Sequence, residues 1–240
     1  MKFIKNKFKS QVYCDTADIN LIRKLSSNSL VKGFTTNPSL MRIAGAKDYK
    51  RYSIKLLKIC NKKPISLEVF ADEENEIEYQ ANIINSWGNS VYVKVPVVNT
   101  KGEFLGKTIK KLSSKGFKLN ITAVYNIQQV KKIIKSLNKN SKTIISIFSG
   151  RMADAGKDPI PVIKKSVALT KRYKNIKILW ASTREPYNYM QSCDCMCDII
   201  TMPPNIIGKI SKFGKSFKSL TLSTVRTFYE DAAKAKFKIK

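Results

Sequence analysis

Strand-like and helix-like sequence patterns alternate along almost the whole chain, and this alternation constrains the fold more than any other feature. Short runs rich in apolar and β-branched residues predict strands at 12–15, 33–36, 65–70, 90–96, 119–122, 143–148, 176–182 and 198–201. Eight such runs with short connections are typical of a (β/α)8 barrel, whereas a doubly wound sheet usually stops at about five to seven strands. We therefore predict an α/β protein with a (β/α)8 TIM barrel over about residues 11–213.

Apolar residues at helical spacing follow the predicted strands. They predict helices at 18–25, 49–60, 72–87, 104–114, 127–137, 161–173, 185–192 and 203–210. After the second strand, Asn37 precedes Pro38, a pair that suits an N-cap followed by the first helical residue. An extra helix is predicted beyond the barrel at 221–235, where Leu222 and Val225 are among the apolar residues spaced to dock on another surface.

Length and composition are those of a single domain. The chain has 240 residues, of which 43% are hydrophobic and 10% aromatic, so it can bury one sizeable core. We predict one domain over residues 1–240. No apolar run reaches membrane-spanning length, and segment 1–10 alternates lysine with isolated apolar residues, unlike a signal peptide. These features predict a cytoplasmic protein with no membrane partner.

Cysteine and histidine usage argues against a metal site. Cys193, Cys195 and Cys197 lie at every second position, which does not match the paired C-x-x-C spacing of structural zinc sites. The chain also has no histidine that could complete such a site. We expect five reduced thiols, no metal and no cofactor.

The formal net charge of +28 raises the question of nucleic-acid binding. The lysines are spread along nearly every segment instead of being concentrated in one arm or helix, and no recognition motif accompanies them. This distribution favours a lysine-rich, solvated surface over a dedicated nucleic-acid face. A positive field would also attract phosphorylated metabolites.

A lysine in the fourth predicted strand is the most informative single residue. Val91, Val93 and Val95 face one side of this strand, and Tyr92 and Lys94 face the other. A solvent-facing strand would explain the lysine. However, β-branched residues dominate the run, as they do in buried parallel strands, and other predicted strands carry polar residues at the equivalent place.

Strand parity directs a set of polar side chains into the barrel, near the carboxyl ends of their strands. The set contains Asp15, Glu68, Lys94, Asn120, Thr122, Ser146 and Ser182. Barrel active sites are built at that end, so we expect these residues to share one mouth. For Asp15 or Ser182 alone, a turn or cap role would serve equally well.

A buried lysine beside carboxylates and hydroxyls, with no histidine and no metal-ligand cluster, indicates imine chemistry. A desolvated lysine loses its proton more easily and can attack a ketone. The protonated imine then accepts electrons when an adjacent carbon–carbon bond breaks. Glu68 and Asp15 are the available acid–base groups, one of them acting through a water held by Thr122. An ion pair between Lys94 and Glu68 inside the barrel is the structural alternative.

Seven short motifs together resemble one enzyme family. They are D-T-A-D at 15–18, T-T-N-P-S at 35–39, E-V at 68–69, V-K-V-P at 93–96, N-I-T at 120–122, S-I-F-S-G-R at 146–151 and A-S-T-R at 181–184. In order and spacing they resemble class I transaldolases and their short relatives, the fructose-6-phosphate aldolase-like proteins. The resemblance covers nearly the whole chain.

The resemblance implies a role for each matching residue. Lys94 would be the Schiff-base lysine, Asp15 would transfer the proton at the substrate C4 hydroxyl, and Glu68 with Thr122 would handle the catalytic water. Substrate hydroxyls would be held by Asn37, Asn120 and Ser146, and the phosphate by Arg151, Ser182 and Arg184. The loop after strand seven is a usual phosphate site in barrels, and arginine binds phosphate bidentately, which agrees with the place of Arg184.

Two positions separate the transaldolase pattern from the aldolase pattern. Aldolase-type members carry tyrosine where this chain has Phe148, which would line the substrate pocket, and glutamine where it has Glu68. The implied activity is transfer of a dihydroxyacetone unit between phosphorylated sugars, as in the pentose phosphate pathway. A lyase that releases dihydroxyacetone is the alternative.

The remaining expectations concern partners. Short members of the family form rings, so a homo-oligomer, a pentamer or decamer, is implied, held partly by the helix at 221–235. A non-catalytic, basic nucleic-acid-binding protein on a barrel scaffold is the other class considered. The presence of Lys94, Glu68 and Asp15 argues against it.

Overall fold

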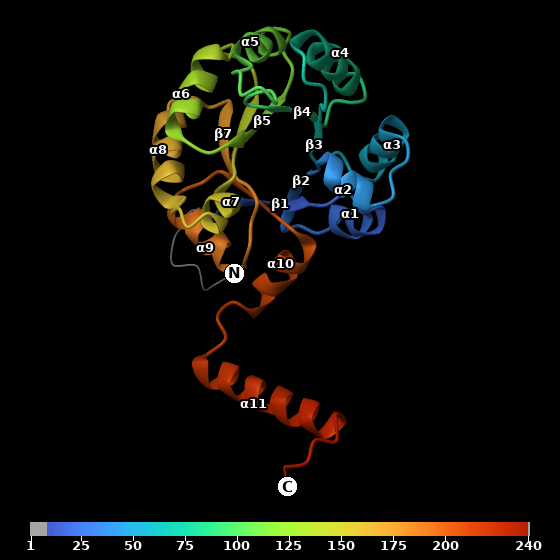
Figure 1. Ribbon diagram of the computed structural model, residues 1–240, viewed down its shortest axis with the longest axis vertical. Helices are drawn as coiled ribbons and strands as arrows, with labels where there is room; N and C mark the ends of the chain where they lie inside the picture. The colour runs from blue at the N-terminus through green and yellow to red at the C-terminus, as the bar shows by residue number, and fades with distance from the viewer. Residues whose placement is uncertain (1–8, 240) are drawn as a thin grey trace.

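Eight parallel strands close into a barrel in which each strand pairs with the next in sequence and β8 pairs with β1 (Figure 1). The computed structural model describes residues 9–239, so most of segment 1–10 and Lys240 lie outside the described residues. The strands are β1 (Gln11–Asp15), β2 (Val31–Thr35), β3 (Ile65–Glu68), β4 (Val91–Pro96), β5 (Leu119–Val124), β6 (Thr143–Ile147), β7 (Ile176–Trp180) and β8 (Ile199–Met202). The predicted (β/α)8 barrel is confirmed.

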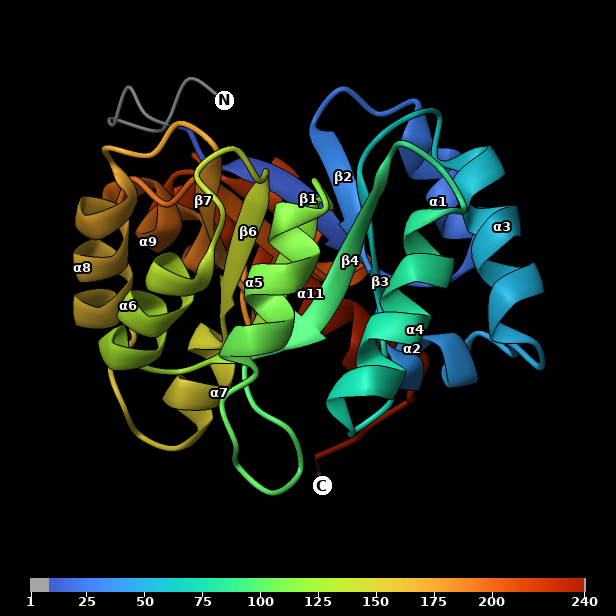
Figure 2. The same ribbon diagram turned by 90° about the horizontal axis from the view of Figure 1, so that it is seen from above.

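All the described helices except the last lie around the barrel or at its carboxyl end (Figures 1 and 2). The helices are α1 (Ile19–Ser26), α2 (Pro38–Ile43), α3 (Tyr49–Ile59), α4 (Glu74–Asn85), α5 (Gly106–Ser114), α6 (Ile127–Ser136), α7 (Ser149–Asp154), α8 (Ile160–Thr170), α9 (Tyr187–Asp194), α10 (Pro204–Lys209), the 3-10 turn η1 (Ile210–Lys212) and α11 (Phe217–Lys234). Several begin at side-chain caps: Asp18, Asn37 and Asp48, for example, each accept a backbone N–H of the first helical turn, and Asn37 is the cap that the sequence predicted.

The barrel has two layers of inward-facing side chains. The lower layer is apolar and contains Tyr13, Tyr92, Ile144, Leu179 and Ile199. The upper layer follows two residues later on most of these strands and is polar, with Asp15, Lys94, Ser146 and Thr201. Because side chains alternate along a strand, residues two apart face the same way, and the polar layer lies above the apolar layer at the carboxyl end.

Besides shifts of one to a few residues at several element ends, two short helices and the end of one strand differ from the sequence prediction. The helix pattern did not identify α7, and it identified only the start of α2, because six residues are too few for a clear helical period. Both helices lie at the carboxyl end of the barrel (Figure 2). The strand predicted at 176–182 is shorter: β7 ends at Trp180, and Ser182 has a left-handed φ of 65°.

The extra helix is present but packs against none of the barrel helices. α11 projects away from the barrel (Figure 1), and no residue in it is buried. Phe217 is 88% exposed and Tyr229 is 77% exposed, which is unusual for large apolar side chains on an ordered helix. The predicted docking surface is therefore not supplied by the barrel of the same chain.

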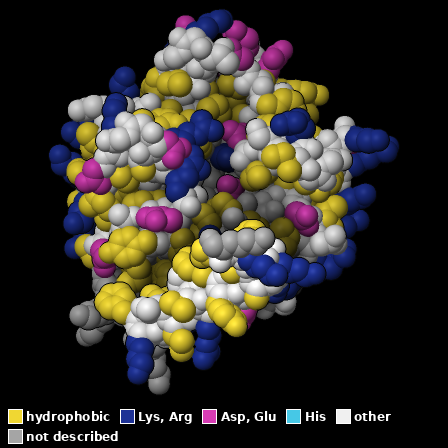
Figure 3. All heavy atoms as spheres, turned by 60° about the horizontal axis from the view of Figure 1, so that its bottom comes forward, with side chains coloured by type: hydrophobic (Ala, Val, Ile, Leu, Met, Phe, Trp, Pro, Cys, Tyr) yellow, Lys and Arg dark blue, Asp and Glu magenta, His cyan; other side chains and the backbone are white. Residues whose placement is uncertain are grey.

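Surface charge and cysteines agree with the sequence interpretation. Figure 3 shows lysine and arginine side chains scattered over the visible face, with acidic side chains between them. The five cysteines are all buried, and none forms a disulfide. Among the described residues, no helix is long and apolar enough to cross a membrane.

Candidate active site

A polar hollow of about 210 Å³ lies at the carboxyl end of the barrel, above the apolar layer. The predicted site residues that line it are Asp15, Asn37, Lys94, Asn120, Thr122, Ser146, Phe148, Arg151, Ser182 and Arg184. Glu68 does not line the hollow, but its carboxylate is paired with Lys94. The structure therefore brings the predicted residues together from strands and loops all around the barrel.

Lys94 lies at the centre of this site. Its side chain is buried, and its ammonium lies 2.9 Å from Glu68 Oε2 and donates to the Thr36 carbonyl at 3.0 Å. Glu68 and Lys94 occupy paired positions on β3 and β4, so the sheet register itself places the carboxylate beside the amine. The ammonium is thus held by a proton acceptor and an oxygen dipole, facing a space that a ketone could enter.

Asp15 is the second carboxyl group in the site. Burial raises its pKa, while the Lys94 ammonium and a hydrogen bond from Thr35 act in the opposite direction. The Thr35 hydroxyl donates to Asp15 Oδ1 at 2.6 Å and lies 2.6 Å from the Thr201 hydroxyl. A carboxyl group with a raised pKa beside a lysine suits proton transfer.

Amide and hydroxyl groups line the side of the hollow formed by β5 and β6. Ser146 donates to Asn120 Oδ1 at 2.7 Å, and Asn120 donates to Ser66 Oγ at 2.9 Å. This network holds the Asn120 side chain in one orientation. The Thr122 hydroxyl is buried, lines the same hollow and has no hydrogen-bond partner among the described residues. Its hydrogen-bonding capacity is available to a water or substrate oxygen.

Two arginines line the hollow from the segments that follow β6 and β7. The Arg184 guanidinium donates from Nε to Asp154 Oδ1 at 3.0 Å, and hydrogen bonding from Arg184, together with its charge, lowers the pKa of the Asp154 carboxyl. Arg151 lies over the Phe148 ring, 5.5 Å from its centroid. Both guanidinium groups are positioned by neighbours, which suits binding of an anion such as phosphate.

The backbone around Ser182 is shaped by an unusual close contact. A Cβ at position 150 would lie 1.6 Å from the Ser182 carbonyl oxygen, so only glycine fits there. Gly150 also donates to the Ala181 carbonyl at 3.3 Å. The prediction that strand parity turns Ser182 inward is wrong, since Ile178 and Trp180, which share its parity, belong to the outer core. The left-handed turn at Ser182 brings the loop to the hollow instead.

Asn37 has a structural role as well as a place in the hollow. Its side-chain oxygen accepts the Leu40 backbone N–H at 2.9 Å, which caps α2. The cap uses the amide oxygen, so a substrate hydroxyl would meet the amide nitrogen.

The sequence interpretation missed three threonines that line the hollow: Thr35, Thr183 and Thr201. Thr35 pairs in register with Asp15, and Thr201 lies two residues after the inward-facing Ile199. The same parity rule that selected Lys94 would have selected both Thr35 and Thr201. Thr183 lies in a loop, where parity gives no information.

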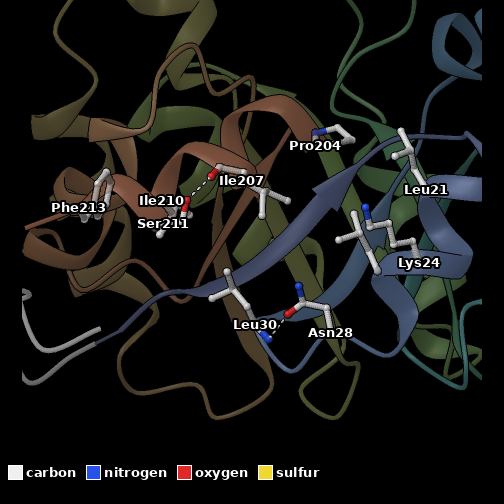
Figure 4. A pocket seen from close by; sticks show the side chains of 11 residues that line it. Leu21, Lys24, Asn28, Leu30, Pro204, Ile207, Ile210, Ser211 and Phe213 are labelled. Carbon is white, nitrogen blue, oxygen red and sulfur yellow. Dashed lines mark hydrogen bonds between the residues drawn. The ribbon is translucent and has the colours of Figure 1, made fainter. Parts of the chain in front are cut away.

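A larger hollow of about 640 Å³ lies elsewhere, between α1 and the α10–η1 segment (Figure 4). We call it the α1–α10 groove. Its lining is mostly apolar and includes Leu21, Leu30, Ile207, Ile210 and Phe213. It has no cluster of acid–base groups, so it is not a candidate for the chemistry.

Comparison with known proteins identifies the family. Residues 12–239 match the family model described as Transaldolase/Fructose-6-phosphate aldolase. The chain belongs to this family of transaldolase- and aldolase-type enzymes. Two proteins named "Probable transaldolase" are similar along their length: one from Herpetosiphon aurantiacus, 32% identical over 92% of this chain and 94% of its own, and one from Brucella melitensis, 32% identical over 95% and 98%.

Solved structures resemble this chain in fold alone. A dihydrodipicolinate synthase family protein from Coccidioides immitis has a TM-score of 0.62 at 11% identity, covering 98% of this chain and 80% of its own. Orotidine 5'-monophosphate decarboxylase from Metallosphaera sedula has a TM-score of 0.54 at 13% identity, covering 85% and 95%.

Proposed function

We propose that this protein transfers a dihydroxyacetone unit between sugar phosphates through an imine on Lys94. The observation that carries the proposal is the buried Lys94 ammonium, paired with Glu68 and facing a polar hollow that also holds Asp15. Family membership supports the same enzyme class. A buried ion pair is a weak source of stability, so a role in chemistry accounts better for keeping these charges inside the barrel.

Imine formation begins when Lys94 transfers a proton to a nearby acceptor, and Glu68 is the carboxylate in contact with it. The neutral amine attacks the C2 carbonyl of the donor sugar, and loss of water from the carbinolamine leaves the imine. The Thr122 hydroxyl, with its unused hydrogen-bonding capacity, holds the water that Glu68 protonates or deprotonates.

Cleavage then uses Asp15. Its carboxylate takes the proton of the C4 hydroxyl, the C3–C4 bond breaks, and the bonding electrons move into the imine to give an enamine. The first aldehyde leaves. A second aldehyde accepts the enamine carbon, Asp15 returns the proton to the new hydroxyl, and water releases the product from Lys94.

The rest of the hollow orients the sugar. Asn37, Asn120 and Ser146 bind its hydroxyls, and the fixed orientation of Asn120 supports that role. Arg151, Ser182 and Arg184, which follow β6 and β7, bind the phosphate. The reacting carbons lie near Lys94.

A lyase that releases free dihydroxyacetone is the second candidate, and Phe148 favours transfer over it. The ring lines the hollow and has no group that could deliver a proton to the enamine. We expect transfer to erythrose 4-phosphate to be much faster than release of dihydroxyacetone. Measuring both products in one fructose 6-phosphate reaction distinguishes the two activities, and equal rates would favour the lyase.

The decisive test is trapping with sodium borohydride in the presence of fructose 6-phosphate. We expect covalent mass at Lys94, located by peptide mass spectrometry, and loss of trapping and turnover in Lys94→Met. Lys63 is a suitable control because its ammonium also donates to backbone carbonyls, those of Leu25 and Asn28, but lies outside the hollow. Label on another lysine, or an active Lys94→Met protein, would contradict the proposal.

We further propose that the protein is a homo-oligomer in the cytoplasm, with phosphorylated sugars rather than nucleic acid as ligands. The unpartnered apolar face of α11 supports the assembly. The scattered lysines support a general electrostatic role over a nucleic-acid surface.

A further inference from the structure

Three side chains from three neighbouring strands form a buried hydrogen-bonded chain at the edge of the active site. The Thr35 hydroxyl of β2 lies 2.6 Å from Asp15 Oδ1 and 2.6 Å from the Thr201 hydroxyl of β8. Thr35 is 3% exposed and Thr201 is 4% exposed. Both threonines line the hollow, and their hydroxyls lie within hydrogen-bond distance of each other.

The number of hydrogens on each hydroxyl determines which group donates and which accepts in these hydrogen bonds. A threonine hydroxyl has one hydrogen to donate and two lone pairs. When Asp15 is a carboxylate, Thr35 donates its only hydrogen to Oδ1, so the contact between the two threonines requires Thr201 to donate to Thr35. When Asp15 is protonated on Oδ1, both hydrogen bonds can reverse, with Thr35 donating to Thr201.

We propose that Thr201, acting through Thr35, is a positioning residue for Asp15. The chain of hydroxyls binds Oδ1 and leaves Oδ2 for the proton of the substrate C4 hydroxyl. Because Thr201 donates to Thr35, it polarises the Thr35 hydroxyl and strengthens the hydrogen bond to the carboxylate. The inference rests on the proposed function, in which Asp15 takes and returns that proton.

Asp15 is surrounded by groups from several strands, and the hydroxyls of Thr35 and Thr201 are among these groups. Burial raises the pKa of the Asp15 carboxyl, and Lys94 from β4 and the Thr35 hydrogen bond act in the opposite direction. Glu68 pairs with Lys94 from β3, Cys14 adjoins Asp15 on β1, and Arg151 and Arg184 also line the hollow. On the remaining two neighbours, β2 and β8, the inward-facing groups beside Asp15 are the hydroxyls of Thr35 and Thr201.

Thr201 also connects the acid–base group to the proposed phosphate loop. The Thr183 hydroxyl donates to the Thr201 carbonyl at 2.7 Å, and Thr183 is flanked by Ser182 and Arg184. The Thr201 carbonyl thus holds the loop in place, while the Thr201 hydroxyl supports Asp15 through Thr35. A substitution that removes only the hydroxyl therefore tests the contact with Thr35 and leaves the contact with the loop intact.

The test is Thr201→Val, which keeps the shape and removes the donor. Weaker donation to the carboxylate raises the Asp15 pKa, and cleavage requires the carboxylate. The acid limb of the kcat/KM profile for fructose 6-phosphate should therefore move to higher pH by about half a unit to one unit. At pH values below that limb's midpoint, kcat/KM should fall by about three- to tenfold, following the same shift.

Two variants serve as comparisons. Thr201→Ser keeps the hydroxyl and should restore the wild-type pH profile. Thr143→Val removes a buried hydroxyl from β6, whose contact is with Ser141 at the other end of the barrel, and should leave the profile unchanged. Circular dichroism and melting temperature show whether each variant is folded, and Thr201→Ala provides a second hydroxyl-free protein if Thr201→Val is unstable.

Borohydride trapping with dihydroxyacetone distinguishes failure of this inference from failure of the proposed function. Imine formation precedes the step that uses Asp15, so Thr201→Val should be trapped at Lys94 as efficiently as the wild type. No trapping in the wild type would overturn the proposed function. Normal trapping with an unshifted profile in the hydroxyl-free variants, or a shift that Thr201→Ser does not reverse, would overturn the role of Thr201.

Discussion

At the residue scale, Lys94 and Glu68 show how a costly arrangement is held in place. Removing two charges from water costs several kcal/mol per ion, and their attraction offsets this only when the geometry is good. Here the distance is 2.9 Å, and the ammonium has a further bond to the Thr36 carbonyl. The site therefore keeps a potential nucleophile and its proton acceptor together in the absence of substrate.

Arg184 provides a residue-scale prediction about substrate binding. Its guanidinium lines the hollow and is held by Asp154. We expect Arg184→Ala to lower kcat/KM for fructose 6-phosphate by about 2–4 kcal/mol of transition-state stabilisation, the scale of a lost charge-assisted contact. Trapping of free dihydroxyacetone on Lys94 should change far less, since that molecule has no phosphate.

The matched control for this measurement is Arg172→Ala. Arg172 follows α8 and lies over the Tyr173 ring, outside the hollow. Arg172→Ala also removes one positive charge from the protein, so it shows how much of the loss in kcat/KM comes from the general positive field. Equal losses for phosphorylated and unphosphorylated compounds in Arg184→Ala would show that Arg184 has only a structural role.

At the element scale, the packing of α7 against the loop after β7 requires glycine at position 150. Gly150 in α7 approaches the Ser182 carbonyl so closely that a methyl group would overlap it. We expect Gly150→Ala to destabilise the protein by about 1–3 kcal/mol, the usual cost of overpacking. It should also weaken binding of phosphorylated sugars, because Ser182 and Arg184 would have to move.

Gly88 is the comparison for Gly150. It lies in the loop between α4 and β4, and nothing lies within 4 Å of a Cβ built there. Gly88→Ala should therefore stabilise the protein by about 0.4–1 kcal/mol, since alanine lowers the entropy of the unfolded chain. Chemical denaturation of both variants measures the two free energies of unfolding. A Gly150→Ala protein as stable as the wild type would show that the loop adjusts freely.

At the scale of the whole molecule, we expect α11 to pack against a partner. Isolated helices are marginal in water, and most helical stability in proteins comes from packing of an apolar face. α11 has exposed Phe217, Val225 and Phe228 and no buried residue. The α1–α10 groove is an apolar surface on the barrel that could accept such a face (Figure 4). We expect α11 of one copy to bind this groove of another.

Light scattering after size-exclusion chromatography tests the assembly. The full chain should be an oligomer, and Phe228→Asp should dissociate it, because a charge would enter the apolar interface. Thr227→Asp, on the same helix, places the charge at a polar position and should leave the oligomer intact. A monomeric wild-type protein would contradict the proposed assembly, and an oligomer unaffected by Phe228→Asp would exclude α11 from the interface.

Much of the site could be predicted from local sequence patterns. The period of two along a strand is a property of the backbone, so the inward direction of Asp15, Glu68, Lys94 and Asn120 follows from their neighbours in sequence. The carboxyl ends of parallel strands meet at one end of a barrel, so a common hollow also follows. Short helices and loop residues such as Ser182 lack this periodicity and were misplaced or missed.

The sequence by itself determined the eightfold alternation, the buried lysine and the family, because each depends on the order of residues within short segments. Tertiary structure decided which groups touch. Closing the barrel places β8 beside β1, so Thr201 meets Thr35 across 166 positions of sequence. The contact of Gly150 with the Ser182 loop and the bond between Arg184 and Asp154 likewise join separate segments. Such contacts depend on the relative positions of packed elements, which no local pattern encodes.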